Sequence, residues 1–359
     1  MSISIFSARK SRIAVAVAAV AISAVALSGC SSSDDTASSS SSAGAAADFG
    51  DVNLQLSWVK DVEFSGEFLA DSNGYYKDAG ISAVNMTAGP STGTSELLSG
   101  TADVALSDAV SVGSAVAQGQ PLKIIGSTFQ RNPFTILSLD EKTPISTPQD
   151  LVGKTIGVDD SNTVLFNAFL AANDIDPDDV TVVPGQFNGP TLLEGGQVDG
   201  YVSYLTNESI QVGLDGFTAV NLAFADFNMP FVAETVTVTQ DSIDNDRDKL
   251  VAFLKAEVQG WNDFIKDPQS GADLALNTYG KDLGLDADLE AAAATAQAEL
   301  VATDETASNG LFTVSDELQS ETVKSLDTAG ITVKASDLFD MSLLADMYKA
   351  NPDLADYSK

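Results

Sequence analysis

Strand-like and helical segments alternate along this chain from about residue 51 onward. Residues 52–56 alternate apolar and polar side chains as a strand does, 67–79 is helical, and 81–86 reads as the next strand. This order predicts an α/β fold in which mostly parallel sheets are covered by helices. Ligands bind such sheets beyond the carboxyl ends of the strands, so we expect a site in loops 58–66, 89–95, 107–108 and 127–130.

The length of the alternating region predicts two lobes, because about 310 residues exceed what one core usually supports. Residues 109–117 are expected to form a helix, and a fresh strand-and-helix unit begins near residue 135. The β-branched run 231–239 suits a strand that crosses back. We therefore expect lobe one at 51–134 plus 240–359, lobe two at 135–239, and two crossover strands between them.

The carboxyl-terminal third is expected to be mostly helical. One helical face is lined by apolar residues, namely Leu250, Phe253, Leu254, Val258, Trp261 and Phe264. This spacing favours a core position for Trp261 over a place in a ligand site. The alanine-rich, acidic stretch 283–305 is expected to be a solvated helix without a chemical role.

The amino-terminal segment has the features of an export signal. Arg9, Lys10 and Arg12 precede a short apolar run that ends in Leu-Ser-Gly before Cys30, the single cysteine of the chain. This order resembles a bacterial lipobox, so we expect a signal peptide at 1–29 and lipidation of Cys30. A flexible Ser/Ala-rich tether is expected at 30–50, which would hold the protein outside the cell on the membrane.

Charge and composition exclude several classes of function. The chain has 51 acidic and 18 basic residues, which disfavours nucleic acid as a partner. It has no histidine, which removes Ser-His-Asp triads, Cys-His dyads and histidine-containing metal sites. We expect no catalytic residue, no metal and no cofactor, and nothing in the sequence indicates more than a monomer.

Several motifs resemble the periplasmic binding proteins for thiamine pyrimidine precursors, sulfonates and nitrate. They cover nearly the whole mature chain and comprise residues 58–66, 74–81, 100–105, 150–157 and 196–208. The resemblance implies the two-lobed type II fold of that family. It also implies capture of a small molecule for the permease and ATPase of an ABC importer, rather than catalysis.

Within that family the Trp58 loop and the Asn207-Glu208 pair look like the pyrimidine-precursor branch. The resemblance implies that Glu208 accepts from the amine of a hydroxymethylpyrimidine or formylaminopyrimidine, since carboxylates accept from such donors. Asp61 and Phe64 occupy loop positions where that branch shows Asn and His, so a larger heterocycle such as riboflavin stays open. The candidate aromatic contacts are Trp58, Phe129, Tyr201 and Tyr204.

An anion such as an alkanesulfonate, taurine or nitrate is the alternative ligand. Ser91 and Thr92 lie before an expected helix, where backbone N–H groups and hydroxyls suit an anion, although simple capping explains them equally well. Arg131 is the arginine within reach of these loops. Carboxylates expected around the same cleft, Asp108, Asp160 and Glu208, would repel an anion unless they were neutralised.

An enzyme is the alternative of another class. The eukaryotic branch of the resembled family includes pyrimidine synthases that consume a histidine, and a chain without histidine cannot perform that reaction. A carboxylate-dependent reaction through Asp160 and Glu208 is the enzymatic possibility that stays open, and the sequence does not fix their separation.

Overall fold

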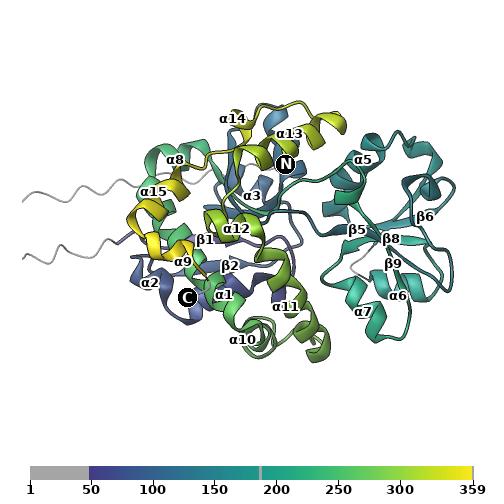
Figure 1. Cartoon of the computed structure of the whole chain (residues 1–359), viewed down its shortest axis with the longest axis horizontal. Coiled ribbons are helices and arrows are strands. Elements are labelled where there is room, and N and C mark those ends of the chain that lie inside the picture. The colour runs from purple at the N-terminus through teal and green to yellow at the C-terminus, as the bar shows by residue number, and fades with distance from the viewer. Residues whose placement is uncertain (1–47, 186–187, 358–359) are drawn as a thin grey trace, which may run out of the picture. The chain divides into compact units, whose positions relative to one another are not determined.

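The computed structural model describes residues 48–185 and 188–357, which form two five-stranded sheets flanked by helices (Figure 1). The expected signal peptide, Cys30 and most of the expected tether lie outside these described residues. Within the described part of the chain, no helix has both the length and the apolar character needed to span a membrane. The α/β class and the two-lobed architecture expected from the sequence are confirmed.

The first sheet has the strand order β2-β1-β3-β10-β4. Its strands are β1 (Val52–Gln55), β2 (Val84–Thr87), β3 (Val104–Asp108), β4 (Leu122–Phe129) and β10 (Ala233–Thr239). Strand β1 pairs in parallel with β2 and β3, whereas β10 lies antiparallel between β3 and β4. Four strands therefore run one way and β10 runs the other.

The second sheet repeats this arrangement with the order β7-β6-β8-β5-β9. Its strands are β5 (Phe134–Leu139), β6 (Thr155–Val158), β7 (Thr181–Pro184), β8 (Gly200–Tyr204) and β9 (Ala219–Ala223). Here β5 is the antiparallel strand, between β8 and β9. In both sheets the reversed strand is the one that follows a passage of the chain from the other lobe.

Helices fill the connections between the strands and most of the carboxyl-terminal third. The α-helices are α1 (Ser65–Ser72), α2 (Tyr75–Asp78), α3 (Thr94–Ser99), α4 (Ala109–Ala117), α5 (Thr163–Ala172), α6 (Gly189–Glu194), α7 (Glu208–Leu214), α8 (Gln240–Asn245), α9 (Arg247–Lys266), α10 (Pro268–Leu274), α11 (Ala287–Val301), α12 (Asp304–Asn309), α13 (Asp316–Thr328), α14 (Ala335–Leu338) and α15 (Ser342–Ala350). Short 3-10 helices are η1 (Val62–Phe64), η2 (Pro148–Leu151), η3 (Asp160–Asn162), η4 (Pro177–Asp179), η5 (Phe224–Asp226) and η7 (Pro352–Ala355), and η6 (Ala275–Tyr279) is a π-helix.

Two segments carry the chain between the lobes, residues 130–133 after β4 and residues 227–232 before β10. They are tied to each other by Asn132, whose backbone N–H donates to Phe231 O at 2.9 Å and whose Nδ2 donates to Met229 O at 2.8 Å. The second crossing thus ends before β10, not after it. Residues 233–239 belong to the first sheet, which differs from the expected lobe boundary at 239, because a β-branched run indicates a strand without indicating its partners.

Other elements differ from the sequence expectations in local ways. The expected helix 67–79 is two helices, α1 and α2, because Gly74 between them has a left-handed φ of 80°. Helix α11 is not simply solvated. Its Glu290 accepts from Val62 N at 2.8 Å and its Gln297 donates to Val62 O and Glu63 O at 3.1 Å, so both side chains are buried against η1.

The apolar stripe on α9 packs into the core of lobe one, as expected. Trp261 is 1% exposed, and its indole lies against α1. A Cβ at Gly66 would come within 2.1 Å of that indole, and a Cβ at Gly260 would come within 2.0 Å of Gly66 O. Glycine at these two positions therefore lets α1 and α9 approach closely, which holds η1 at the start of α1 in a fixed place.

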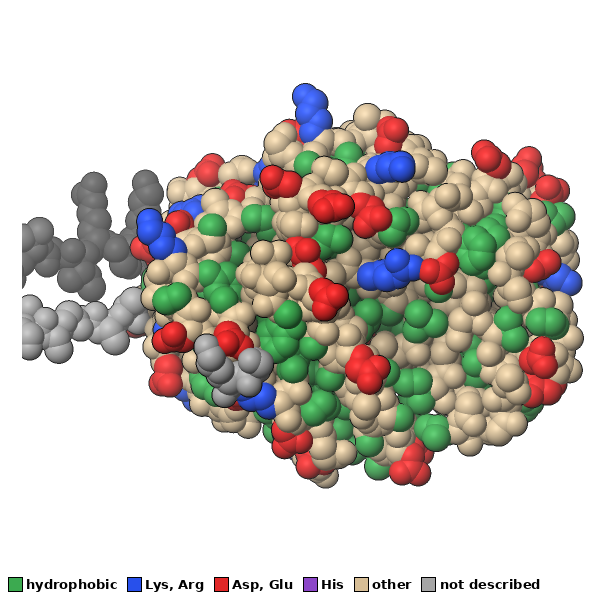
Figure 2. All heavy atoms as spheres, in the orientation of Figure 1, with side chains coloured by type: hydrophobic (Ala, Val, Ile, Leu, Met, Phe, Trp, Pro, Cys, Tyr) green, Lys and Arg blue, Asp and Glu red, His purple; other side chains and the backbone are tan. Residues whose placement is uncertain are grey.

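Acidic side chains are spread over the visible face of the protein, and lysines and arginines are fewer (Figure 2). This follows from the excess of 51 acidic over 18 basic residues. Some acids are also inside. Glu67 of α1 and Glu257 of α9 are fully buried with their carboxyls hydrogen-bonded to each other, and Tyr76 donates its hydroxyl to Glu257. Such a pair must hold a proton, because two adjacent buried carboxylates repel each other.

This buried pair predicts that the free energy of unfolding falls as pH rises. Burial raises the pKa of Glu67 from 4.5 to about 8, so between these values the folded protein keeps a proton that the unfolded chain has released. Stability from this group is complete below pH 4.5 and is lost as pH rises through 8. Glu67→Gln should flatten the decline by on the order of 2–4 kcal/mol, measured by urea unfolding across that range.

The exposed residue Glu321 of α13 provides the control for this experiment. Glu321→Gln should leave the pH profile of the wild-type protein unchanged. Equal pH profiles for the wild-type and Glu67→Gln proteins would show that the pair does not hold the proton assigned to it.

Candidate functional site

A cleft of about 610 Å³, its open mouth included, lies between the two sheets. It forms where the parallel strands of both lobes end, after β1, β3, β6 and β8. The antiparallel strands β5 and β10 run the other way, so each contributes its first residues, Phe134 and Glu234. This is the edge at which open α/β sheets bind ligands.

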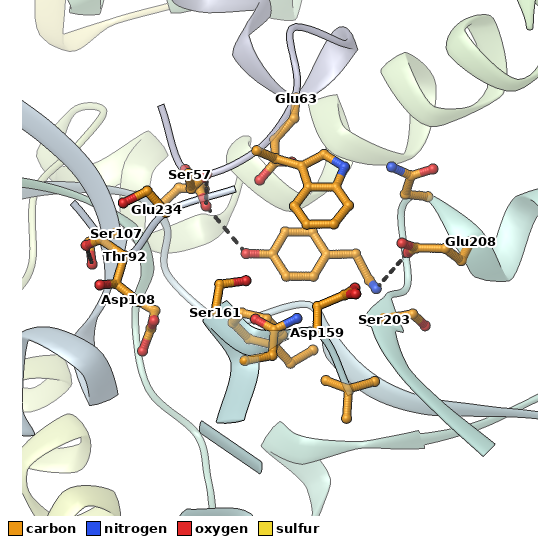
Figure 3. Close-up of a pocket in the computed structure, with 17 residues that line it drawn as sticks. Ser57, Glu63, Thr92, Ser107, Asp108, Asp159, Ser161, Ser203, Glu208 and Glu234 are labelled. Atoms are coloured by element: carbon orange, nitrogen blue, oxygen red, sulfur yellow. Dashed lines mark hydrogen bonds between the residues drawn. The ribbon is translucent and has the colours of Figure 1, made fainter. Parts of the chain in front are cut away.

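The cleft is lined from both lobes, as Figure 3 shows for the labelled side chains. Lobe one contributes Ser57, Trp58, Glu63, Ser91, Thr92, Ser107, Asp108 and Glu234. Lobe two contributes Phe134, Asp159, Ser161, Asn162, Val202, Ser203, Tyr204, Asn207 and Glu208. Of the twelve expected ligand contacts, the structure brings together Trp58, Ser91, Thr92, Asp108, Tyr204, Asn207 and Glu208.

The lobe-one wall is held by capping and by bonds between loops. Asp108 ends β3 and caps α4, accepting from Val110 N at 2.8 Å and Ser111 N at 2.9 Å. Ser107 Oγ donates to Thr92 O at 2.6 Å, which ties the 89–95 loop to β3. Helix α3 after this loop is six residues long. Arg131 pairs with Asp226 at the surface and does not line the cleft.

The lobe-two wall is organised around Tyr204 and Glu208. Glu208 begins α7, and its Oε2 accepts from Tyr204 N at 3.0 Å. Burial raises the pKa of Glu208, an effect that this backbone N–H opposes. The Tyr204 hydroxyl reaches across the cleft and donates to Glu234 Oε1 at 3.3 Å.

The remaining five expected residues lie outside this cleft. Asp61 caps η1 by accepting from Glu63 N at 3.0 Å and accepts from Asn207 Nδ2 at 3.4 Å, so it links the lobes instead. Phe64 and Phe129 are buried in the core, with Phe64 packed edge-on against Phe68. Asp160 is exposed at the start of η3, and its neighbour Asp159 lines the cleft in its place.

Tyr201 stands behind the cleft wall and supports it. Its side chain is 1% exposed, and its hydroxyl donates to Asp159 Oδ2. A Cβ at Gly157 would come within 2.6 Å of the ring, and one at Gly189 within 2.5 Å, so glycines make room for it. Tyr201 therefore holds a lining carboxylate in position without lining the cleft itself.

Sequence reasoning missed two lining glutamates, Glu63 and Glu234. Glu234 interrupts the apolar and β-branched run 231–239, and an acidic residue inside a buried strand is a signal that could have found it. Its backbone has a left-handed φ of 49°, at a break in the register between Ala233 and Thr235. Such a bulge redirects a side chain, here into the cleft.

No metal centre is formed by the described residues: none of them gather into a group of three or more His, Cys, Asp or Glu side chains suited to an ion. The lining carboxyls come from different elements of the two lobes, and those of Asp108, Asp159, Glu208 and Glu234 accept hydrogen bonds from neighbouring donors. The chemistry that this arrangement supports is hydrogen bonding to donor groups beside aromatic surfaces.

The support given by Tyr201 can be measured as stability. Tyr201→Phe removes a hydroxyl that donates to a buried carboxylate, so the free energy of unfolding should fall by about 1–3 kcal/mol in urea titration. Tyr75→Phe is the matched control, because the Tyr75 hydroxyl donates to Asp263 at 2.6 Å in a half-exposed place. Its loss should cost less than about 1 kcal/mol. Equal losses in both variants would contradict the role assigned to Tyr201.

Comparison with known proteins gives a family and a fold. The family model described as NMT1/THI5 like matches residues 61–271. The Riboflavin-binding protein RibY of Chloroflexus aurantiacus is 26% identical, over 63% of this chain and 65% of that protein, so the match spans less than two thirds of the relative.

Two solved structures illustrate the fold. A protein of Bordetella bronchiseptica RB50 is similar with a TM-score of 0.68 and 17% identity, over 84% of this chain and 98% of that one. The periplasmic aliphatic sulphonate binding protein SsuA of Escherichia coli is similar with a TM-score of 0.58 and 16% identity, over 77% and 91%. With its two sheets, its cleft and the family match over more than half of its length, this chain belongs to the NMT1/THI5-like family and has the periplasmic binding protein fold.

Proposed function

We propose that this protein is the solute-binding component of an ABC importer and captures a small heteroaromatic molecule in the cleft between its lobes. The observation that carries the proposal is the cleft itself, which both lobes line through their strand ends. In the described part of the chain, two crossing segments connect these lobes. A protein built in this way can close on a ligand, and a permease can recognise the closed form.

The lining favours a flat ring that bears N–H donors. Trp58, Phe134 and Tyr204 offer aromatic surface, and Glu208 and Asp159 offer carboxylate oxygens. A thiamine pyrimidine precursor of the hydroxymethylpyrimidine or formylaminopyrimidine type has these features. Riboflavin is the second candidate, because the relative in Chloroflexus aurantiacus is named a riboflavin-binding protein.

Anions and catalysis are the less favoured alternatives. Among the described residues that line the cleft, five are acidic and none is Lys or Arg, which disfavours an alkanesulfonate, taurine or nitrate. The enzymatic alternative depends on carboxylates such as Asp160 and Glu208, and Asp160 is exposed outside the cleft.

The remaining features complete the proposed role. Cleavage before Cys30 and lipidation of its thiol would anchor the protein at the outer face of the cell membrane, with 30–50 as a tether. The permease and ATPase subunits of the importer are the proposed protein partners, and the protein would act as a monomer.

Ligand capture can be tested by thermal unfolding against a panel of aminopyrimidines, thiamine, riboflavin, alkanesulfonates and nitrate. A ligand that binds only the folded protein raises stability by RT ln(1 + [L]/Kd), so the bound class should raise the melting temperature selectively. A shift with a pyrimidine or a flavin is expected. A shift with anions alone would contradict a heteroaromatic solute, and no shift with any compound would count against solute capture.

Substitutions then locate the ligand. Trp58→Ala and Glu208→Ala should each weaken binding by about 1–3 kcal/mol, through loss of aromatic contact and of a buried acceptor. Trp261→Phe is a useful companion, since the chain has two tryptophans and Trp261 is core. It should change intrinsic fluorescence and stability but not affinity. Full affinity in both alanine variants would remove those residues from the site.

The anchor is tested separately. Cys30→Ser should abolish incorporation of a radiolabelled fatty acid and move the protein from the detergent phase to the aqueous phase on partitioning. Retention of the label in this variant would refute lipidation at Cys30.

A further inference from the structure

The charged residues among the described lining of the cleft are all acidic. Its acidic lining residues are Glu63, Asp108, Asp159, Glu208 and Glu234, and the described part of the lining has no Lys or Arg to balance them. Figure 3 shows these carboxyls approaching a common space from both lobes. Charges confined between protein walls are screened less than charges at a surface. Acids crowded together in this way favour either a bound proton or a bound cation over several adjacent negative charges.

Three of the five carboxyls accept from backbone N–H groups or from a phenol that lies behind the cleft wall. Asp108 accepts from the first turn of α4, Asp159 accepts from Tyr201, and Glu208 accepts from Tyr204 N. These bonds explain the three acids as parts of the fold. They do not require a ligand.

Glu63 and Glu234 are arranged differently, because their carboxyls are in hydrogen-bond contact with each other. Burial and the neighbouring acid raise the pKa of Glu63, and burial raises the pKa of Glu234 to about 7. Glu234 also accepts from Ser57 Oγ, at 3.0 Å and 3.1 Å to its two oxygens, and from the Tyr204 hydroxyl at 3.3 Å. Two acids that share a proton on a cleft wall form a place where an incoming positive charge replaces that proton.

The backbone holds Glu234 in this place at a conformational cost. Its left-handed φ of 49° is unfavourable for a residue with a side chain, and its side chain is 4% exposed although it carries an acid. A glycine would adopt this backbone conformation without that cost. The bulge therefore fits a role in which the carboxyl must reach the cleft.

A second feature points to a ligand independently of the acids. Ser203 of β8 lines the opposite wall, is 4% exposed, and its Oγ is buried without a hydrogen-bond partner among the described residues. A buried hydroxyl left unpaired costs free energy. A solute that spans the cleft can meet Ser203 at one end and the acid pair at the other.

We infer that the solute carries a positive charge, such as a protonated amine or amidine, which the Glu63–Glu234 pair binds while Ser203 contacts the other end of the molecule. This inference rests on the proposed function, because it names the class of solute for the same cleft. A neutral pyrimidine or flavin would bring no positive charge to the two glutamates, and an anion would be repelled by them.

Matched ligands test the charge directly. The hydroxymethylpyrimidine precursor and its aminomethyl analogue share a ring and differ in one group, a neutral hydroxyl or an ammonium at neutral pH. Hydroxymethylpyridine and aminomethylpyridine make a second pair, with riboflavin as a neutral probe and ethanesulfonate as an anionic one. Calorimetric titration of the wild-type protein should show the ammonium compound of a pair binding about tenfold tighter or more.

Glutamine variants test whether Glu63 and Glu234 cause the preference for the ammonium compound. Glu63→Gln and Glu234→Gln keep the size of each side chain and should reduce the preference for the ammonium compound to about threefold or less, with the neutral compound little affected. Glu321→Gln on the exposed face of α13 should keep the full preference. If a glutamine variant does not fold, as circular dichroism would show, the ratio measured in the wild-type protein still decides the charge of the solute.

The outcomes separate the inference from the function beneath it. Equal or tighter binding of the neutral compounds, or binding of riboflavin or ethanesulfonate alone, overturns the cationic solute and leaves solute capture standing. A preference that persists in both glutamine variants overturns the assignment to Glu63 and Glu234. Failure of every probe to bind overturns the inference and counts against heteroaromatic capture as well.

Discussion

The reversed strand in each sheet is the constraint on which the rest of the structure depends. When the chain passes from lobe one to lobe two it enters the second sheet as β5, and when it returns it enters the first sheet as β10. Both strands insert antiparallel to their neighbours, so both begin at the edge where the other strands end. The two crossing segments therefore lead directly into residues that line the cleft, Phe134 at the start of β5 and Glu234 near the start of β10.

This topology explains why the cleft is lined by residues from the starts of two strands as well as by residues from loops. The carboxyl ends of the parallel strands and the loops after them supply Trp58, Asp108 and Asp159, as the rule for open sheets predicts. The starts of β5 and β10 supply Phe134 and Glu234. Asn132 binds one crossing segment to the other. A movement of one lobe against the other would therefore bend the segments that precede Phe134 and Glu234.

Buried acids recur in this protein, and the fold supports them in distinct ways. Glu67 and Glu257 lie in the core as a pair with Tyr76 and Trp261 as donors. Glu290 of α11 binds the backbone of η1, which bears Glu63. The close contact of α1 with α9 fixes the other end of η1. Acids that are costly to bury thus position the loop that carries a cleft acid.

Sequence alone determined the local elements and the class of fold, because strand and helix periodicity is a property of neighbouring residues. It also singled out Trp58, Tyr204 and Glu208, which follow from motif and hydrogen-bond chemistry. Only the tertiary structure decided that Asp159 and not Asp160 faces the cleft, that Phe64 and Phe129 are core, and that β10 joins the first sheet. Strand partners and side-chain direction depend on residues far apart in the chain, and a one-residue change in register reverses which side chain faces the cleft.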